Sequence, residues 1–331
     1  MSDKPTGLFR RNELLEALLK ELNDELAPAE ELLLNRYRQT QEIQHPIILV
    51  MGPLRSGTTL FVQWLANTGL IAYPSNLLSR FYRVPIIGAK IQLLLTDPRY
   101  NFRDELGEFV QQSEYKSENG KTRGVLAPNE FWYFWRRFLA EPDRDIWTDD
   151  ELRQSMDAGA LVSELAGITS VFQKPFAAKG MLFNYNIPFL NSILDKVIFV
   201  QIHRDPVSNV SAALEARERQ MESLNRWYSF KIPEYESLKD LDPVRQVAGQ
   251  IHYINKAVVD GLARVDESRK ILVEYESFCG DPAAVYEQLM AKLGMNLSLN
   301  QYNGPAGFTE TRAVTGSAAA VIKSALASFA D

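Results

Sequence analysis

The stretch from Pro46 to Leu60 constrains the fold of this chain more than any other part of its sequence. Its letters are PIILVMGPLRSGTTL, and no polar side chain occurs from Ile47 to Met51. An uninterrupted apolar run of this length is typical of a strand that is buried on both faces of a parallel sheet. A short loop framed by Gly52 and Gly57 follows, and an apolar pattern then resumes. We therefore expect a strand, an anion-binding loop and a helix in succession.

The loop carries the chemical groups that hold an oxyanion. Glycines at both of its ends allow the positive φ angles that turn several backbone N–H groups inward. The helix expected to begin near Thr58 directs the positive end of its dipole at the same point. The groups predicted to bind the anion are the side chains of Arg55, Ser56, Thr58 and Thr59 and the backbone of Gly57.

The spacing of this loop approaches the nucleotide P-loop pattern G-x-x-x-x-G-K-[ST], but Thr58 stands where that pattern has its lysine. In an ATP-binding loop that lysine reaches the β- and γ-phosphates, and the next hydroxyl holds magnesium. A loop with Arg55 and without the lysine suits a single phosphate–sulfate unit and no metal. The sequence here resembles the sulfotransferases that use 3′-phosphoadenosine 5′-phosphosulfate (PAPS), whose loop commonly contains R-S-G-T-T.

A second apolar run, from Val197 to Ile202, ends in His-Arg-Asp-Pro. It predicts another buried strand with Arg204 at its carboxyl end, the edge at which open α/β sheets bind ligands. The resembled family has a 3′-phosphate site here, formed by an arginine in an R-D-P-like turn and a serine eight residues further on. Arg204 matches this arginine, but the serine nearest to the eighth position is Ser211, one residue early. Ser211 is the candidate phosphate contact and Ser208 is the alternative.

Two lysines extend the resemblance. The segment from Phe176 to Phe183 is similar to the second strand of the family, which ends in a lysine, and Lys179 matches that lysine at the rim of the sulfuryl pocket. Residues 315–323 resemble a weakened form of the C-terminal loop that closes over the 3′-phosphate, and Lys323 supplies the charge in this comparison. For both lysines, a solvated surface position is the alternative interpretation.

The family pattern does not identify the general base. Several carbohydrate and tyrosine sulfotransferases have a glutamate in the region that is occupied here by Ser75 and Asn76. Further along, Asn129 is a predicted helix N-cap, which places Glu130 in the first turn of a helix rich in aromatic residues. We therefore name Glu130 as the candidate base, and a glutamate that only complements the helix dipole is the alternative. The aromatic residues at 131–138 are typical of a core, with a wall for sugar rings as a second possible role.

Composition narrows the class of protein. The 331 residues include 36 basic and 42 acidic side chains, and the net charge of −6 does not favour a nucleic-acid partner. The single cysteine, Cys279, cannot form an intramolecular disulfide, so we expect a reducing, cytoplasmic location. No apolar stretch is long enough to predict a membrane span, and the scattered histidines offer no zinc-type spacing.

Leucines at helical spacing precede the first strand, and Pro28 suits the start of a second helix there. We expect residues 1–45 to form a helical extension, either packed on the domain or in a homodimer contact, and residues 46–331 to form the sulfotransferase domain. The resemblance implies an α/β fold in which helices flank a parallel sheet, with P-loop NTPase-like topology.

The implied activity is transfer of a sulfuryl group from PAPS, the co-substrate, to a hydroxyl or amine of a small-molecule or glycan acceptor, by family analogy a carbohydrate or glycolipid. The catalytic residues are then Arg55, Glu130 and Lys179. Two alternatives are a P-loop kinase or NTPase, which the missing lysine disfavours, and a catalytically silent sulfonucleotide-binding protein.

Overall fold

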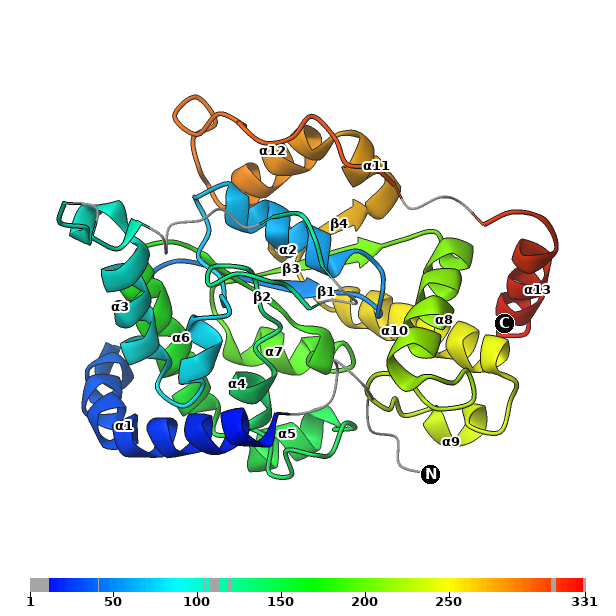
Figure 1. Cartoon of the computed structure of the whole chain (residues 1–331), viewed down its shortest axis with the longest axis horizontal. Helices are drawn as coiled ribbons and strands as arrows, with labels where there is room; N and C mark the ends of the chain where they lie inside the picture. Colours follow the sequence, from blue (N-terminus) through cyan, green and yellow to red (C-terminus); the bar gives the residue numbers. More distant parts are fainter. Residues whose placement is uncertain are drawn as a thin grey trace.

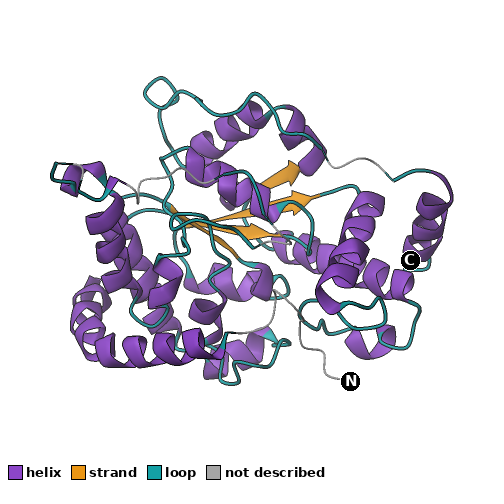
Figure 2. Cartoon of the chain, viewed as in Figure 1, coloured by secondary structure: helices purple, strands orange, loops and turns teal. Residues whose placement is uncertain are grey.

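The computed structural model describes residues 12–40, 42–103, 105–107, 114–117, 121–310 and 314–329. A four-stranded sheet lies at the centre, with helices above and below it (Figures 1 and 2). Its strands are β1 (Ile47–Met51), β2 (Phe176–Lys179), β3 (Val197–His203) and β4 (Lys270–Glu274). Neighbouring strands pair in parallel, in the order β2-β1-β3-β4. The predicted α/β fold, a parallel sheet flanked by helices, is therefore confirmed.

Helices connect and cover the strands. In chain order they are α1 (Glu13–Thr40), α2 (Thr58–Asn67), α3 (Pro85–Thr96), α4 (Trp132–Arg136), α5 (Asp149–Ser155), α6 (Ala158–Phe172), α7 (Ile187–Ile193), α8 (Pro206–Met221), α9 (Tyr235–Leu238), α10 (Pro243–Leu262), α11 (Tyr275–Gly280), α12 (Pro282–Lys292) and α13 (Gly316–Ala327). None of these helices, within the described ranges, is both long and apolar enough to cross a bilayer.

Three of the helices begin at an Asp-Pro pair, which explains where they start. In α8, α10 and α12 the aspartate is the N-cap and the proline occupies the first turn; the aspartates are Asp205, Asp242 and Asp281. Each aspartate side chain accepts a backbone N–H of the first turn. The proline has no N–H to leave unsatisfied at that position, so the dipeptide both caps and starts a helix.

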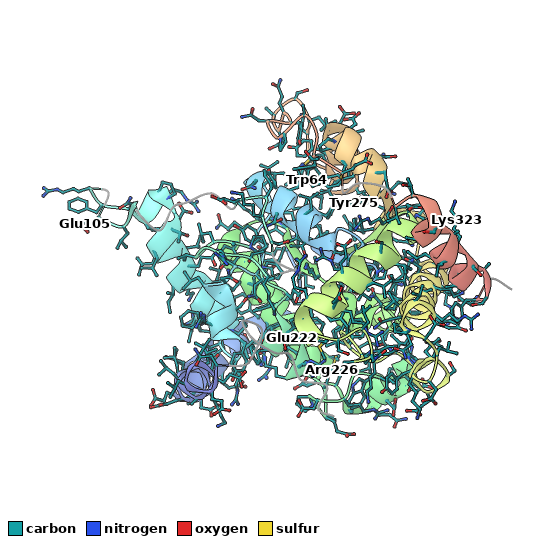
Figure 3. All side chains as sticks on the ribbon, turned by 45° about the vertical axis from the view of Figure 1, so that its right-hand side comes forward. Trp64, Glu105, Glu222, Arg226, Tyr275 and Lys323 are labelled. Atoms are coloured by element: carbon teal, nitrogen blue, oxygen red, sulfur yellow. The ribbon has the colours of Figure 1, made fainter. Side chains whose placement is uncertain are left out.

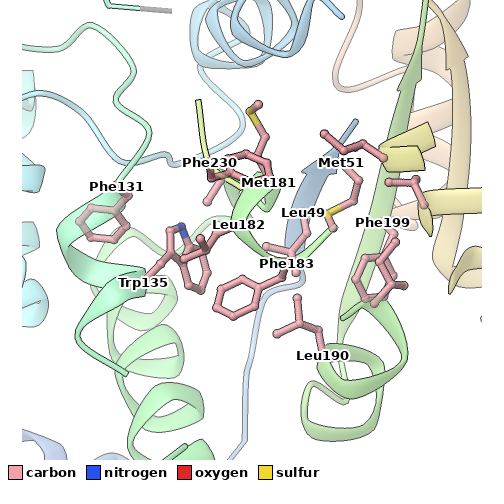
Figure 4. Packing of buried hydrophobic residues seen from close by; sticks show 14 of the residues in the cluster. Leu49, Met51, Phe131, Trp135, Met181, Leu182, Phe183, Leu190, Phe199 and Phe230 are labelled. Atoms are coloured by element: carbon pink, nitrogen blue, oxygen red, sulfur yellow. The ribbon is translucent and has the colours of Figure 1, made fainter. Parts of the chain in front are cut away.

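The side chains of the sheet alternate between two cores. Ile47, Leu49 and Met51 of β1 pack into a cluster with α4 to α8, α10 and α13 (Figure 4). Ile48 and Val50 face a second cluster, which α2, α11 and α12 complete. Because both faces of β1 are covered, the whole strand is buried, as its unbroken apolar sequence predicted.

The segment before β1 differs from the prediction of two helices. A single helix, α1, runs through Pro28. The expected break is absent because residues on both sides of Pro28, among them Leu19 and Leu34, are buried against the rest of the chain, and this packing compensates for the backbone hydrogen bond that a proline removes. Glu30 accepts the N–H groups of Ile86 (2.7 Å) and Ile87 (3.0 Å) at the start of α3. The boundary between an extension at 1–45 and a domain at 46–331 stays a prediction.

The parallel sheet brings four chain segments to one edge. The carboxyl ends of its strands lead into the Gly52 loop after β1, Lys179 at the end of β2, Arg204 after β3 and Tyr275 after β4. In open parallel sheets ligands bind at this edge, so the candidate site is built from these four segments.

Candidate active site

The loop between β1 and α2 has the backbone geometry that its glycines predicted. The φ angles of Gly52, Arg55 and Gly57 are +142°, +61° and +102°, and Gly57 is the N-cap of α2. A Cβ atom on Gly57 would lie 2.3 Å from Cδ2 of Tyr275. Glycine is therefore required at position 57 both by the φ angle and by the ring that covers it.

Side chains from two other strand–helix connections brace the loop. Asn184 accepts the N–H of Gly52 at 3.1 Å and donates to its carbonyl oxygen at 2.9 Å. Asn209 on α8 donates to the carbonyl of Leu54 at 2.8 Å, and Arg204 donates to that of Arg55 at 2.8 Å. Because its carbonyl oxygens are bound from behind, the loop is held in one conformation before any ligand arrives.

The three loop hydroxyls have different surroundings. Ser56 is buried and donates to the carbonyl of Pro53 at 2.8 Å, so its side chain stabilises the loop itself. Thr58 is buried against Sδ of Met181 (3.7 Å), and Thr59 accepts a hydrogen bond from Nζ of Lys179 (2.6 Å). Both threonines line the adjoining cleft, whereas Ser56 is not among its lining residues.

A cleft of about 740 Å³ opens above the loop. One side, here called the loop side, is formed by Arg55, Gly57, Thr58, Thr59, Arg204 and Tyr275. A second group of lining residues, here called the aromatic side, consists of Trp132, Tyr133, Trp227, Tyr228 and Phe230. Glu130 and Lys179 also line this cleft. One cleft therefore holds a cationic anion site, a group of aromatic side chains, a carboxylate and an ammonium group.

Two arginines give the loop side its charge. Arg204 is 5% exposed, and its guanidinium lies 4.9 Å from the centre of the Tyr275 ring. Burial lowers the pKa of Arg55, and the charge of Arg204 nearby acts in the same direction. Within the described ranges, the buried Nε atoms of Arg55 and Arg204 have no hydrogen-bond acceptor. Buried donors of this kind are normally satisfied, so both groups have capacity for an anion.

Glu130 and Lys179 form an ion pair at the wall of the cleft. Their Oε1 and Nζ atoms are 3.1 Å apart, and the other carboxylate oxygen of Glu130 accepts a hydrogen bond from the indole of Trp132. Burial raises the pKa of Glu130, but the charges of Lys179 and Lys121 and the indole bond outweigh it, so the net pKa is lowered. Burial also lowers the pKa of Lys179, which is 6% exposed. A solvated surface position for Lys179 is thereby excluded.

The local structure around Glu130 differs from the prediction. Helix α4 begins at Trp132 and its N-cap is Phe131, so Glu130 precedes the helix and Asn129 is not its cap. The chain stays extended because Asn129 donates its backbone N–H to Pro74 (2.7 Å) and its side-chain amide to Asn76 (2.8 Å). This pairing fixes Glu130 ahead of the helix, where its carboxylate pairs with Lys179.

Ser75 and Asn76, which stand in the region where relatives have a glutamate, are structural. Ser75 donates to Gln92 at 2.6 Å and Asn76 donates to the carbonyl of Gly124 at 2.9 Å. Asn76 fastens the segment at 121–131, here called the strap, which carries Glu130, whereas Ser75 joins its own segment to α3. Neither residue is among those that line the cleft.

Three predicted nucleotide contacts are not brought into the cleft. Ser211 is partly buried on α8, and Ser208 donates to Asp205 (2.7 Å) within the helix cap; neither lines the cleft. The loop expected at 315–323 is wrong: apart from Thr315, these residues belong to α13, and Lys323 lies exposed on that helix (Figure 3). The alanine-rich sequence there favours a helix over a loop.

The sequence did not single out Tyr275 or the aromatic residues at 227–230. Tyr275 follows β4 directly, so the rule that located Arg204 after β3 also applies to it. Trp227, Tyr228 and Phe230 belong to a connection between α8 and α9 with no periodic pattern, and their position depends on tertiary contacts. Phe131, Phe134, Trp135 and Phe138 are buried, whereas Trp132 and Tyr133 line the cleft. The aromatic segment therefore forms both core and cleft wall.

Comparisons with known proteins place the chain in a family. A profile of the sulfotransferase family matches residues 46–298, whereas no curated protein matches. Similar solved structures include the sulfotransferase STF9 from Mycobacterium avium, at 17% identity and TM-score 0.49 over 88% of this chain and 69% of that one. Another is STF1 from Mycobacterium tuberculosis H37Rv, at 15% identity and TM-score 0.49 over 88% and 79%. A third is the sulfotransferase from Alicyclobacillus acidocaldarius, at 14% identity and TM-score 0.41 over 86% and 93%. Because the family profile covers most of its length, from β1 to beyond α12, this chain belongs to the sulfotransferase family.

Proposed function

We propose that the chain transfers a sulfuryl group from PAPS to a hydroxyl or amine of an acceptor. The observation that carries this proposal is the buried pair of Glu130 and Lys179, because Lys179 also bonds to Thr59 of the anion loop. A carboxylate and an ammonium group thus stand at the point where the loop side meets the aromatic side. A protein that only bound the nucleotide would not need an ionised carboxylate there.

The loop side supports the placement of the donor. The inward N–H groups of the loop, Arg55, Thr58 and Thr59 suit the 5′-phosphosulfate. Arg204, whose Nε has no acceptor within the described ranges, suits the 3′-phosphate. A recess of about 660 Å³, whose lining includes Leu60, Tyr115 and Phe308, adjoins the cleft and shares Leu60 with it. Its aromatic rings suit the adenine base.

The reaction follows from this placement. The acceptor oxygen or nitrogen attacks sulfur, the bond from sulfur to the bridging oxygen breaks, and adenosine 3′,5′-bisphosphate leaves with that electron pair. Glu130 takes the proton of the acceptor, for which its lowered pKa keeps it ionised at neutral pH. Arg55 and Lys179 stabilise the charge on the phosphate and sulfuryl oxygens, and the fixed loop supplies positioning. No metal takes part in this scheme.

The aromatic side supports a carbohydrate or glycolipid acceptor. Trp132, Trp227 and Phe230 present ring surface to the cleft, and ring surface packs against the apolar faces of sugars. Arg136, which also lines the cleft, lies 5.6 Å from the ring of Trp132 and pairs with Asp145. These charged groups next to aromatic rings offer hydrogen bonds to acceptor hydroxyls.

Two measurements test the proposed function. Calorimetric titration should show that the protein binds adenosine 3′,5′-bisphosphate in preference to ATP with magnesium; the opposite preference would refute the choice of donor. Transfer of labelled sulfate from PAPS to carbohydrates, lipids and phenols then tests activity. Binding without transfer to any acceptor of the panel would identify a silent sulfonucleotide-binding protein instead. The homodimer and the cytoplasmic location stay predictions.

A further inference from the structure

Tyr228 lies on the aromatic side of the cleft and is held by a residue of α8. Gln220, which is buried on that helix, donates its side-chain N–H to the Tyr228 hydroxyl at 3.1 Å. A buried amide that bonds to a tyrosine hydroxyl fixes the position of the hydroxyl oxygen at the tip of the side chain. The hydroxyl oxygen is thus already engaged as an acceptor, and this leaves its own proton for another partner.

A second buried glutamine, from a different helix, fixes the backbone that directly follows the Tyr228 side chain. Gln250 on α10 donates to the carbonyl oxygens of Tyr228 (3.2 Å) and Phe230 (3.3 Å). Between them Ser229 has a φ of +71°, an uncommon conformation for a residue with a side chain. The two glutamines therefore hold Tyr228 by its hydroxyl and by its main chain, in a connection that has no regular secondary structure of its own.

The Tyr228 hydroxyl lies within the electrostatic field of both reacting groups. Burial raises the pKa of Tyr228 to about 12, with Arg55 opposing the rise and Glu130 adding to it. The hydroxyl is therefore protonated at neutral pH. Within the described ranges no protein group accepts its proton, although the side chain lines the same cleft as Arg55 and Glu130. A fixed neutral donor is thus present in the cleft that holds the anion loop and the base.

We propose that Tyr228 is a further catalytic residue, whose hydroxyl donates a hydrogen bond to a non-bridging oxygen of the sulfuryl group during transfer. This inference rests on the proposed function. In the step itself the acceptor proton goes to Glu130 and the electron pair of the broken bond goes to the bridging oxygen, so Tyr228 keeps its own proton throughout. Its role is electrostatic: a donor that is already oriented costs little reorganisation when charge redistributes over the sulfuryl oxygens.

The placement complements the other donors. Arg55 and the loop N–H groups follow β1 and Lys179 ends β2, whereas Tyr228 comes from the connection between α8 and α9. All of these residues line one cleft. A sulfuryl group in transit has three non-bridging oxygens, so a donor from a separate chain segment adds to those that the strand ends supply.

The direct test is Tyr228→Phe, which removes the hydroxyl and keeps the ring. We expect kcat for labelled-sulfate transfer to fall by about 10²- to 10³-fold, the loss that removal of one donor to a developing charge produces. The Kd of adenosine 3′,5′-bisphosphate should change by less than about threefold, because this product lacks the sulfuryl group, and KM for PAPS should change equally little, because the proposed bond strengthens only during transfer. Tyr185→Phe is the matched control: its hydroxyl bonds to Glu234 at 2.9 Å away from the cleft, and its kcat should equal that of the wild type.

Gln220→Met supplies a second test, because Gln220 bonds to the Tyr228 hydroxyl and we expect it to act as a positioning residue. It should lower kcat less than Tyr228→Phe does, and the double variant should be no slower than Tyr228→Phe alone. Thermal unfolding of each variant separates loss of positioning from loss of fold. Additive effects in the double variant would assign Gln220 a role that does not pass through Tyr228.

The outcomes separate this inference from the proposed function. Wild-type transfer with an unchanged kcat in Tyr228→Phe overturns the role of Tyr228 and leaves the sulfotransferase proposal intact. A rise in KM for the acceptor at constant kcat also overturns it, because that result describes a binding residue. If the wild type binds adenosine 3′,5′-bisphosphate but transfers sulfate to no acceptor, the proposed function fails, and the role of Tyr228 fails with it.

Discussion

The two sides of the cleft are built in different ways. The loop side consists of residues that directly follow parallel strands, and buried amides hold its backbone; Asn184 and Asn209 bond to the loop carbonyls. The residues of the aromatic side belong to α4, which follows the strap at 121–131, and to the connection at 222–234; side-chain bonds from Asn76 and Gln250 keep the strap and this connection in place. Strand ends vary little among related sequences, whereas loops vary more. The proposed donor site is thus tied to the fold, and we expect the proposed acceptor site to vary without disturbing it.

The largest expected effect comes from changing Glu130, whose pair with Lys179 joins the two sides of the cleft. Glu130→Gln removes the proposed base and should lower kcat by about 10²- to 10⁴-fold, the range that general-base catalysis supplies. The Kd of adenosine 3′,5′-bisphosphate, measured by calorimetry, should stay within about threefold of the wild type, since among the described residues the Glu130 carboxylate bonds to Lys179 and Trp132 and not to the loop.

Glu164→Gln is the control for Glu130→Gln. Glu164 is also a buried glutamate, paired with Arg137, but it does not line the cleft. The Glu164→Gln variant should unfold at a lower temperature than the wild type and keep the same kcat. An unchanged turnover in Glu130→Gln would remove this residue from the mechanism.

A change on the loop side should act on the nucleotide instead. Gly57→Ala meets both a φ of +102° and the ring of Tyr275, so the loop must shift and the Kd of adenosine 3′,5′-bisphosphate should rise by about 10- to 100-fold. In Gly69→Ala the φ of +70° imposes the same kind of strain, but the new Cβ meets no atom within 4 Å. This control should be less stable by about 1 kcal/mol and bind normally. Equal binding by both variants would show that the loop is not the anion site.

The pair of Glu130 and Lys179 should determine the acid limb of the pH profile. The pKa of Glu130 is lowered in the folded protein, so its carboxylate stabilises the fold above the ordinary glutamate pKa, and this stability is lost as pH falls through the lowered value. Activity should decline over the same acid range. Lys179→Met removes the charge that most lowers the pKa of Glu130, whereas burial still raises that pKa. The acid limb of kcat/KM should therefore move to higher pH. A limb that stays in place would mean that another group is the base.

The smallest effect concerns the predicted C-terminal contact. Lys323 is exposed on α13, so Lys323→Ala should change the nucleotide Kd by less than about twofold, as surface substitutions usually do. Arg204→Lys is the reference, because the buried guanidinium bonds to the loop and stacks on Tyr275; it should weaken binding by about tenfold. If Lys323→Ala weakened nucleotide binding more than Arg204→Lys did, the 3′-phosphate would bind at the C-terminal segment instead.

The loop side could be predicted from the sequence better than the rest of the cleft could. The strand from Ile47 to Met51, the loop after it and the strand that leads to Arg204 follow from local apolar patterns, which the burial of both sheet faces imposes. The ion pair of Glu130 and Lys179 joins residues 49 positions apart, and no local pattern encodes that separation. The sequence indicates Glu130 as a base but predicts its conformation incorrectly, because tertiary bonds from Asn129 to Pro74 and Asn76 override the helical tendency of that segment.

Tyr228 shows more clearly which residues local sequence patterns cannot predict. Its neighbours in the sequence carry no period, and its position depends on Gln220 and Gln250 from two helices. A rule that inspects the residues directly after each buried strand finds Arg204 and extends to Tyr275. It cannot find a residue that approaches the same cleft from a connection between helices.

The paired bonds between Asn184 and Gly52 have a kinetic consequence. The side-chain amide of Asn184 satisfies both the N–H and the carbonyl oxygen of Gly52, so that the backbone at this residue cannot rotate without breaking two buried hydrogen bonds. The loop is therefore unsuited to act as a nucleotide-dependent switch. We therefore expect the backbone at Gly52 to have the same conformation with and without a bound nucleotide.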